Sequence, residues 1–413
     1  MSNNPRFHKE KAERIRLWLI SELYYPEETS TGYYITRIAE GLADDFDVKV
    51  LSGQPNYSAR GTIAPKHEVH KGVEIFRVKG TRLDKNVIVF RLINMMSLSI
   101  TVLMKAVFSI RRGDRVMVVT NPPTMPFIAA FASLLRGATY TLLIHDNYPE
   151  ILFAVNKLKK GSFIANILSF FNRWLYKYAA KIIVVGRDMN ELIARKTARL
   201  DIPIVTISNW AELEAVAPAP KLDNPLLMHL GITDKFVFLY AGNMGHPNDL
   251  ESIVSCAESL ASESRIHFLF LGTGVKRPWL EKQVRLRSLK NLTVLEPRPR
   301  SEQRVFLNAC DVALVSLVDK MLGVSMPSRT YNIMAAGKPI LALAESGSEV
   351  ARVIEEENIG WVVPPGNPLA LLSAVRSAFD ERDNLHKMGA RARRSAETKY
   401  SLETAIEKYR DEL

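Results

Sequence analysis

The sequence predicts an α/β protein made of two doubly wound, Rossmann-like parallel-sheet domains that face each other across a cleft. Thirteen short runs rich in Val, Ile and Leu alternate with longer helical stretches. Apolar runs without internal alternation are typical of strands covered on both faces. Strand–helix alternation gives right-handed βαβ units, and a proline-containing stretch divides the runs into two groups. Two sheets are therefore expected.

The first group of runs predicts an N-terminal domain over residues 15–210. Its strands are expected at LWLIS (17–21), VKVLSG (48–53), VEIFRVKG (73–80), RVMVVTN (115–121), TYTLLIHD (139–146), KIIVVG (181–186) and PIVTISN (203–209). Residues 1–14 are polar and basic, and the apolar run that follows is too short for a signal peptide. We expect a flexible basic leader there.

The second group predicts a C-terminal domain over residues 235–395. Its strands are expected at FVFLYAG (236–242), IHFLFLG (266–272), LTVLE (292–296), VALVSL (312–317), PILALAE (339–345) and GWVVPP (360–365). Residues 211–234 contain three prolines and predict a linker. Residues 396–413 predict a C-terminal helix that can cross back to the first domain.

Composition narrows the class of protein. A chain of 413 residues with 47% hydrophobic and 24% charged residues is typical of soluble globular proteins. Cys256 and Cys310 lie in apolar, helical surroundings, so no disulfide framework is expected and a reducing cytosol fits. The net charge of +11 favours an anionic partner, or else a solvated basic surface. No zinc-finger spacing or RNA-binding strand signature occurs, so we expect no nucleic acid.

The segment MPSRTYNIMAAGKPILA, residues 326–342, predicts a buried helix that begins at Pro-Ser-Arg. A helix N-terminus already exposes unpaired N–H groups and a partial positive charge. Arg329 adds positive charge at that end, which is unfavourable unless an anion binds there. Ser328 and Arg329 are therefore candidate anion ligands, and pairing of Arg329 with a nearby carboxylate is the alternative.

Several segments together resemble one enzyme family. In order they are ISELYYPEETSTGYYITRIAEGL, IHDNYPEI, ISNWAE, FLYAGNMGHPNDLESIV, FLFLGTGV, ACDVALVSL, MPSRTYNIMAAGKPILA and SGSEVARVIEEENIGWVVPPGN. This set is similar to the bacterial retaining GT-B glycosyltransferases of family four, above all the WbuB-like group that builds O-antigen, capsule and exopolysaccharide repeat units. The resemblance covers roughly residues 15–395.

The resemblance implies a metal-independent, retaining transfer of a hexose or N-acetylhexosamine from a nucleoside-diphosphate sugar, with UDP favoured. The acceptor would be a saccharide or a polyprenyl-diphosphate-linked saccharide. The protein would be cytoplasmic and peripheral on the inner face of the cell membrane, with no cofactor. Asp45-Phe46-Asp47 closes a helix, so no metal site is expected. A nucleotide-sugar epimerase and a non-catalytic nucleotide-sugar or membrane-binding scaffold are the alternatives.

The resemblance also implies a set of donor-binding residues near strand ends and helix starts: Gly32, Gly242, Asn243, Gly245, Gly272, Gly274, Ser328, Arg329, Ser348 and Glu349. Many family members carry two glutamates at the positions that Val324 and Asn332 occupy here, so those donor contacts do not carry over. Glu349 is the candidate to contact the ribose in place of those glutamates. Helix capping after Ser348 is its alternative.

The acceptor is expected at the first domain. Asp146, Glu150 and His145 follow a strand, at the end where ligands of such sheets bind. Asp146 is the first candidate for the base that takes the acceptor's proton. The donor phosphate itself is the alternative base, in which case Asp146 orients the acceptor. Glu22 and Asn121 are further acceptor-binding candidates.

Two apolar, basic stretches favour an anionic membrane surface as a partner. Residues 87–112 carry Arg91, Lys105, Arg111 and Arg112 beside an apolar run, and residues 161–181 combine Phe, Trp and Tyr with basic residues. The longest uncharged piece, residues 92–104, falls short of the ~20 residues that a spanning helix needs. Interfacial helices and ordinary core helices are the two interpretations.

Overall fold

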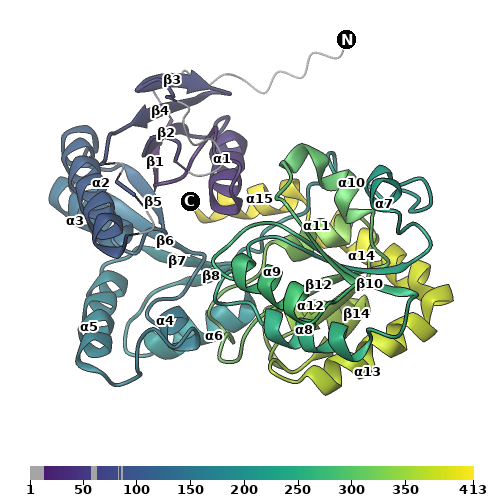
Figure 1. Ribbon diagram of the computed structural model, residues 1–413. Coiled ribbons are helices and arrows are strands. Elements are labelled where there is room, and N and C mark those ends of the chain that lie inside the picture. Colours follow the sequence, from purple (N-terminus) through teal and green to yellow (C-terminus); the bar gives the residue numbers. More distant parts are fainter. Residues whose placement is uncertain (1–13, 57–62, 82, 85–86) are drawn as a thin grey trace, which may run out of the picture.

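The structure is a computed structural model that describes residues 14–56, 63–81, 83–84 and 87–413. The leader expected over residues 1–14 therefore lies outside the described residues, apart from Arg14. The described chain forms two α/β domains, each built on its own mostly parallel sheet (Figure 1). The predicted fold class is confirmed.

The sheet of the first domain has eight strands in the order β3-β4-β2-β1-β5-β6-β7-β8. They are β1 Arg16–Ser21, β2 Asp47–Ser52, β3 His67–His70, β4 Val73–Arg77, β5 Arg115–Val119, β6 Thr139–Ile144, β7 Lys181–Val184 and β8 Ile204–Thr206. All neighbours pair in parallel except β3 and β4, which form an antiparallel hairpin. The seven strands predicted from apolar runs are present, whereas β3 was not predicted.

Helices cover both faces of this sheet. They are α1 Ser30–Leu42, α2 Ile88–Ser109, α3 Met125–Arg136, α4 Glu150–Ala154, α5 Phe163–Lys177 and α6 Arg187–Lys196. Helices α2 and α3 pack side by side on one face, and α1 covers the other (Figure 1). Helix α5 follows β6 and lies beside α3. As a result α2, α3 and α5 share one side of the domain.

The second domain has a fully parallel six-stranded sheet in the order β11-β10-β9-β12-β13-β14. Its strands are β9 Phe236–Ala241, β10 Ile266–Leu271, β11 Leu292–Leu295, β12 Val312–Ser316, β13 Ile340–Leu343 and β14 Gly360–Val363. Its helices are α8 Leu250–Ser259, α9 Arg277–Leu286, α10 Gln303–Leu307, α11 Arg329–Ala335, α12 Glu349–Glu357, α13 Pro368–Asp380 and α14 Leu385–Lys399. All residues of β10 and β12 are buried, as the unbroken apolar runs predicted.

The two domains are joined by more than the connecting chain. Residues 213–224 run along the second domain and lead into α7, Pro225–Leu230, whose start Asn224 caps. The last helix, α15 Leu402–Glu412, packs on α1 of the first domain. One continuous apolar core runs from the first sheet through Trp210 and Tyr331 to the second. This shared core fixes how the strand ends of the two sheets face each other.

Candidate functional site

Three sequence-predicted acceptor-side residues lie on adjacent strands of the first sheet. Glu22, Asn121 and Asp146 follow β1, β5 and β6 within two residues of each strand end. Because these strands are neighbours and parallel, the three residues share the carboxyl edge of the sheet. All three are half-buried. The structure thus brings together residues that are far apart in the sequence.

The connection between β12 and α11 reaches across to this edge. We call residues 323–328 the bridging segment. The main-chain N–H of Asn147 donates to the carbonyl of Val324 at 2.8 Å, and its side-chain amide donates to the carbonyl of Gly323 at 2.7 Å. Ser325 pairs with Asp146 in an isolated antiparallel bridge. The candidate base is therefore held directly against the second domain.

The pKa values of Asp146 and His145 are both shifted from their usual range. Burial raises the pKa of Asp146 to about 6, and a hydrogen bond with Ser325 acts in the opposite direction. Burial lowers the pKa of His145 to about 4, so its imidazole is neutral near pH 7. The hydroxyl of Thr120 accepts the main-chain N–H of His145 at 3.2 Å. A carboxyl with a pKa near 6 is suited to exchanging protons at neutral pH.

Glu150 has a different environment from Asp146. Its carboxylate pairs with the ammonium of Lys196 at 2.8 Å, and Lys196 also donates to the carbonyl of Tyr148 at 3.1 Å. The pair anchors the turn after β6. The carboxylate of Glu150 is engaged by Lys196 within the first domain, whereas Asp146 contacts the bridging segment, so Asp146 remains the better candidate base.

Arg329 lies at the start of α11 against the first strand of the second sheet. Its guanidinium carbon is 4.7 Å from the centre of the Tyr240 ring. Its Nη1 is buried, and no acceptor among the described residues lies within hydrogen-bonding distance. Arg329 also forms no ion pair with a described carboxylate. A buried guanidinium nitrogen without a partner is rare, because its hydration is lost without compensation.

The N-terminus of α1 meets the N-terminus of α11 across the domain boundary. The hydroxyl oxygens of Ser30 and Ser328 are 2.7 Å apart and share a hydrogen bond. The hydroxyl of Thr29, which precedes α1, is buried without a hydrogen-bond partner among the described residues. Gly32 is required here because a Cβ would lie 2.9 Å from the carbonyl oxygen of Glu27. Two helix N-termini and Arg329 thus converge on one place, a combination that favours anion binding.

The glycine-containing turns after β9 and β10 stack directly on each other. A Cβ at Gly242 would lie 3.0 Å from the guanidinium carbon of Arg329, and one at Gly272 would lie 2.0 Å from the carbonyl oxygen of Gly242. Gly274 lies against the main chain of Met244. Asn243 sits in the same turn, and its side chain lies beside Gly245 and Gly274. The predicted donor-side residues after these two strands therefore form one compact layer under Arg329.

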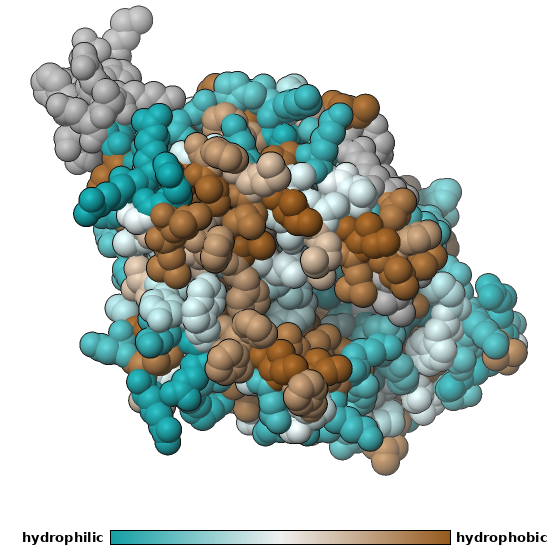
Figure 2. All heavy atoms as spheres, turned by 90° about the vertical axis from the view of Figure 1, so that its left-hand side faces the viewer, coloured by the Kyte–Doolittle hydropathy of each residue, from teal (hydrophilic) through white to brown (hydrophobic). Residues whose placement is uncertain are grey.

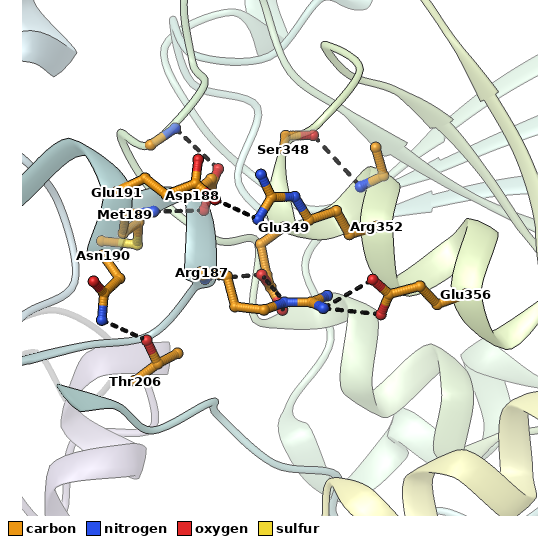
Figure 3. Close-up of polar contacts among 12 residues, drawn as sticks. Arg187, Asp188, Met189, Asn190, Glu191, Thr206, Ser348, Glu349, Arg352 and Glu356 are labelled. Atoms are coloured by element: carbon orange, nitrogen blue, oxygen red, sulfur yellow. Dashed lines mark hydrogen bonds and ion pairs between the residues drawn. The ribbon is translucent and has the colours of Figure 1, made fainter.

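Ser348 and Glu349 begin α12, and Glu349 takes part in a contact between the domains that the sequence did not predict (Figure 3). The hydroxyl of Ser348 accepts the N–H of Ala351 and caps α12. The carboxylate of Glu349, 3% exposed, accepts the main-chain N–H of Arg187 at 2.8 Å and its Nε at 2.9 Å. Arg187 also pairs with Glu356 at 2.8 Å. The ribose role proposed for Glu349 has no support in this geometry, because both carboxylate oxygens are engaged by Arg187.

A second part of this contact involves the N-terminus of α6. The carboxylate of Asp188 accepts the N–H of Gly323 in the bridging segment at 2.9 Å. Arg352 of α12 pairs with Glu191 at 2.7 Å (Figure 3). We call the Arg187–Glu349, Arg187–Glu356 and Arg352–Glu191 pairs the interdomain clasp. No local pattern signals it, because each pair joins residues about 160 positions apart.

The two positions that lack the family's glutamates have structural contacts in this chain. Val324 is 2% exposed and belongs to the apolar core. The side-chain oxygen of Asn332 accepts the main-chain N–H of Glu212 at 2.9 Å, and its amide donates to Gln303 at 3.3 Å. Asn332 therefore ties α11 to the connection between the domains. Among the described residues, no group of three His, Cys, Asp or Glu side chains could hold a metal ion.

Comparison with protein families assigns both halves of the chain. Residues 229–395 match the family "Glycosyl transferases group 1", and residues 30–210 match "Glycosyl transferase 4-like domain". The chain is 32% identical over 403 residues to the probable glycosyltransferase WbjE of Pseudomonas aeruginosa, covering 95% of this chain and 96% of that protein. It is 25% identical over 413 residues to the putative colanic acid biosynthesis glycosyl transferase WcaI of Escherichia coli K12, covering 94% and 97%.

Solved structures show the same two-domain arrangement. The chain superposes on sucrose-phosphate synthase of Thermosynechococcus elongatus with a TM-score of 0.76 at 16% identity, covering 96% of this chain and 97% of the other. It superposes on Anabaena HepE, solved in complex with UDP-glucose, with a TM-score of 0.72 at 14% identity, covering 97% and 100%. The protein is thus a GT-B glycosyltransferase. It belongs to the group 1 glycosyltransferase family with a 4-like first domain, whose relatives include enzymes of polysaccharide biosynthesis.

Proposed function

We propose that this protein transfers a hexose or N-acetylhexosamine from a nucleoside-diphosphate sugar, with UDP favoured, to a saccharide that is free or carried on a polyprenyl diphosphate. Transfer retains the anomeric configuration and needs no metal ion. The product is part of a cell-surface polysaccharide, and the reaction takes place on the cytoplasmic side of the membrane. The family and its polysaccharide-synthesising relatives support the transferase class.

The observation that carries this proposal is the unpartnered Nη1 of Arg329 at the meeting point of α1 and α11. A diphosphate placed there would accept hydrogen bonds from the guanidinium, from the hydroxyls of Ser30 and Ser328, and from N–H groups at the helix starts. Each of these groups can donate a hydrogen bond to an anion, and each is held in place at the start of α1 or α11. Neutralising a diphosphate in this way replaces the role that a divalent cation has in other enzymes.

The same groups stabilise the reaction's developing charge. When the bond between the anomeric carbon and the phosphate oxygen breaks, negative charge moves onto the nucleoside diphosphate. Preorganised donors aimed at that charge lower the barrier most in a site with little water. A new bond then forms from the acceptor oxygen to the anomeric carbon, and the acceptor's hydroxyl proton goes to Asp146 or to a donor phosphate oxygen. A pKa near 6 allows Asp146 to accept it.

A donor screen followed by a transfer assay tests the proposal. Thermal shift with a panel of nucleoside diphosphates and their sugars identifies the nucleotide, and UDP is expected to raise the Tm most. Incubation of the stabilising labelled donor with bacterial membranes should then yield free nucleoside diphosphate and a labelled lipid fraction. A new nucleotide-sugar without transfer would identify an epimerase instead. Binding without any turnover would leave only the scaffold interpretation.

A further inference from the structure

One side of the first domain exposes an unusual amount of apolar surface. Figure 2 shows this side, where apolar residues gather in several patches. Of the 28 large apolar side chains that are exposed in the described residues, sixteen lie on α2, α3 and α5. They are Val89, Phe90, Leu92, Ile93, Met96, Ile100, Met104 and Phe108 on α2, Phe131, Leu134 and Leu135 on α3, and Phe163, Ile164, Ile167, Phe170 and Phe171 on α5. We call this set the three-helix face. Exposed apolar surface concentrated in this way marks an interaction site.

Helix α2 has two apolar stripes on opposite sides. Leu98, Val102 and Ala106, at helical spacing, are buried in the core. A parallel stripe at every fourth residue, from Leu92 to Phe108, points outward. Residues Val89–Ser109 are long and apolar enough to cross a membrane by length and composition, and 22% of their most apolar window is buried. Because one stripe is part of the domain core, the helix lies along the surface and offers the other stripe to a partner.

The net positive charge of the protein is concentrated in the part of the chain that contains α2, α3 and α5. Residues 87–187 contain thirteen Lys and Arg but only three Asp and Glu, so they carry ten of the eleven net positive charges. Helices α2, α3 and α5 contain no acidic residue. Nine exposed cations flank the three-helix face and form no ion pair with another described residue: Arg91, Arg111, Arg112, Arg136, Lys157, Lys159, Lys160, Arg173 and Lys177. An apolar face ringed by unpaired cations complements an anionic lipid surface.

We infer that the three-helix face docks on an anionic bilayer and seats the carboxyl edge of the first sheet next to the lipid. This inference adds α3 to the two stretches that the sequence suggested. It also removes Lys105 from the docking cations, because its ammonium lies 4.7 Å above the ring of Phe76 and is half-buried. Docking itself does not depend on the proposed function. Only the idea that the bilayer carries the lipid-linked acceptor rests on it.

The face is continuous with the candidate acceptor site. A narrow crevice between α3 and α5 is lined by Phe127, Leu175 and Tyr176, and Asp146 also lines it. The ring of Phe171, part of the three-helix face, packs edge-on against Phe127 with ring centres 6.4 Å apart. The crevice is too small for a lipid chain, because its cavity volume is only about 30 Å³. It therefore marks where the apolar surface approaches Asp146.

A matched pair of double variants tests the apolar part of the face. Phe108→Glu with Phe170→Glu changes two side chains that are 81% and 70% exposed, so the fold should be unaffected. Leu286→Glu with Leu369→Glu, at 68% and 76% exposure on α9 and α13, is the control with the same change of charge. Co-sedimentation with phosphatidylcholine vesicles containing phosphatidylglycerol should show at least about a tenfold loss of binding for the first variant. The control should bind like the wild type.

A second pair tests the charge. Arg111, Arg112, Lys159 and Lys160 are all changed to Gln in one variant, and exposed Lys282, Arg285, Lys290 and Lys387 of the second domain are changed to Gln in its control. The first variant should lose at least about tenfold in binding to anionic vesicles at low salt, because each cation near the surface contributes. The control should lose much less. Equal losses would show non-specific attraction and overturn the inference.

Two further outcomes complete the test. Wild-type protein that stays in the supernatant with anionic vesicles overturns the inference. So does a wild-type dimer that Phe108→Glu with Phe170→Glu converts to a monomer, because a second copy would then cover the face. Transfer to a soluble saccharide acceptor is measured in parallel. Transfer without vesicle binding would refute only the docking, whereas vesicle binding without any donor turnover would refute only the proposed function.

Discussion

At the scale of single residues, Arg329 shows how a local irregularity in the sequence pointed to a site. A cation at a helix N-terminus is unfavourable by itself, and the structure gives its buried Nη1 no partner. Sequence and structure therefore agree in making Arg329 a candidate anion ligand, and anion binding itself stays a prediction. The sequence could not predict the partner helix, because Ser30 and Ser328 are 298 positions apart.

The Arg329→Ala variant should bind nucleoside diphosphate more weakly by about 2–3 kcal/mol, the typical effect of losing a hydrogen bond to a charged group. Its thermal stability should be nearly unchanged, because Nη1 makes no hydrogen bond within the described protein. Calorimetric titration measures the first effect and a melting curve the second. Arg329→Lys keeps the charge without the planar fork, and should recover part of the affinity. Unchanged affinity in Arg329→Ala would assign the diphosphate to other groups.

Asp146→Asn should lower turnover by at least about 100-fold while donor binding stays intact, if Asp146 takes the acceptor's proton. Wild-type activity should fall as the pH drops below about 6, because the carboxylate then becomes protonated. The residual activity of the variant should lack this acid limb. A variant with full activity would move the proton transfer to the donor phosphate.

The same variant should increase the stability of the fold by an amount that depends on pH. The pKa of Asp146 is raised in the folded state, so the folded protein binds more protons than the unfolded chain between about pH 4 and 6. Its contribution to stability is therefore greatest at low pH and is lost as the pH rises through 6. Asp146→Asn should have a higher Tm than the wild type at pH 8, and this advantage should disappear near pH 4. Melting curves at the two pH values compare them directly.

At the scale of elements, strands were more predictable than the contacts between helices. Unbroken apolar runs mark strands covered on both faces, and all thirteen predicted runs contain one. Strand β3, His67–His70, was missed because its sequence HEVH is polar and its side chains alternate between exposed and half-buried. For α2, the sequence left interfacial and core helices as alternatives. The core interpretation is confirmed for one stripe, which is buried, whereas the other stripe is exposed and the interfacial interpretation stays a prediction.

The interdomain clasp gives a prediction for α6 and α12. Removing Arg187 would leave the Glu349 carboxylate, 3% exposed, without its main ion-pair partner. The side chain of Arg187 is itself 41% exposed, so we expect a loss of about 1–2 kcal/mol rather than the ~3–5 kcal/mol typical of fully buried pairs. Arg352→Ala breaks a pair whose partner Glu191 is 51% exposed, and should cost less than about 1 kcal/mol.

Denaturant titration of the two clasp variants measures this difference. Arg187→Ala combined with Glu349→Gln should recover part of the lost stability, because the buried charge is then removed as well. If Arg187→Ala and Arg352→Ala are equally mild, the carboxylate of Glu349 is hydrated without Arg187. The clasp would then contribute to the orientation of the domains and little to their stability.

At the scale of the whole molecule, the last helix returns from the second domain and packs on the first. Helix α15 packs on α1, with Tyr409 and Leu413 buried, and its surface pairs join Arg410 to Asp45 and Lys181 to Glu412. The sequence suggested that residues 396–413 can cross back, but it could not show which surface they cover. The apolar faces of α1 and α15 match only in the folded molecule.

Truncation of the chain after residue 399 removes α15. It should therefore destabilise the first domain, although α15 follows the second domain in the sequence. Loss of the α15 contacts would expose apolar side chains of α1 that are now covered, so the Tm should fall by several degrees. The Arg410→Ala variant is the matched control. It removes an exposed ion pair and should change the Tm by about a degree or less. If the two proteins melt alike, α15 does not support the first domain.

The short contact between Ser30 and Ser328 also sets how a ligand enters. Their oxygens are 2.7 Å apart and one hydroxyl donates to the other, so this hydrogen bond must break before both hydroxyls can donate to a phosphate. We expect it to break by separation of the two helix starts, which then close again around the donor. Association would then be governed by the frequency of this opening rather than by diffusion alone. Stopped-flow binding should show a rate that levels off with increasing donor concentration.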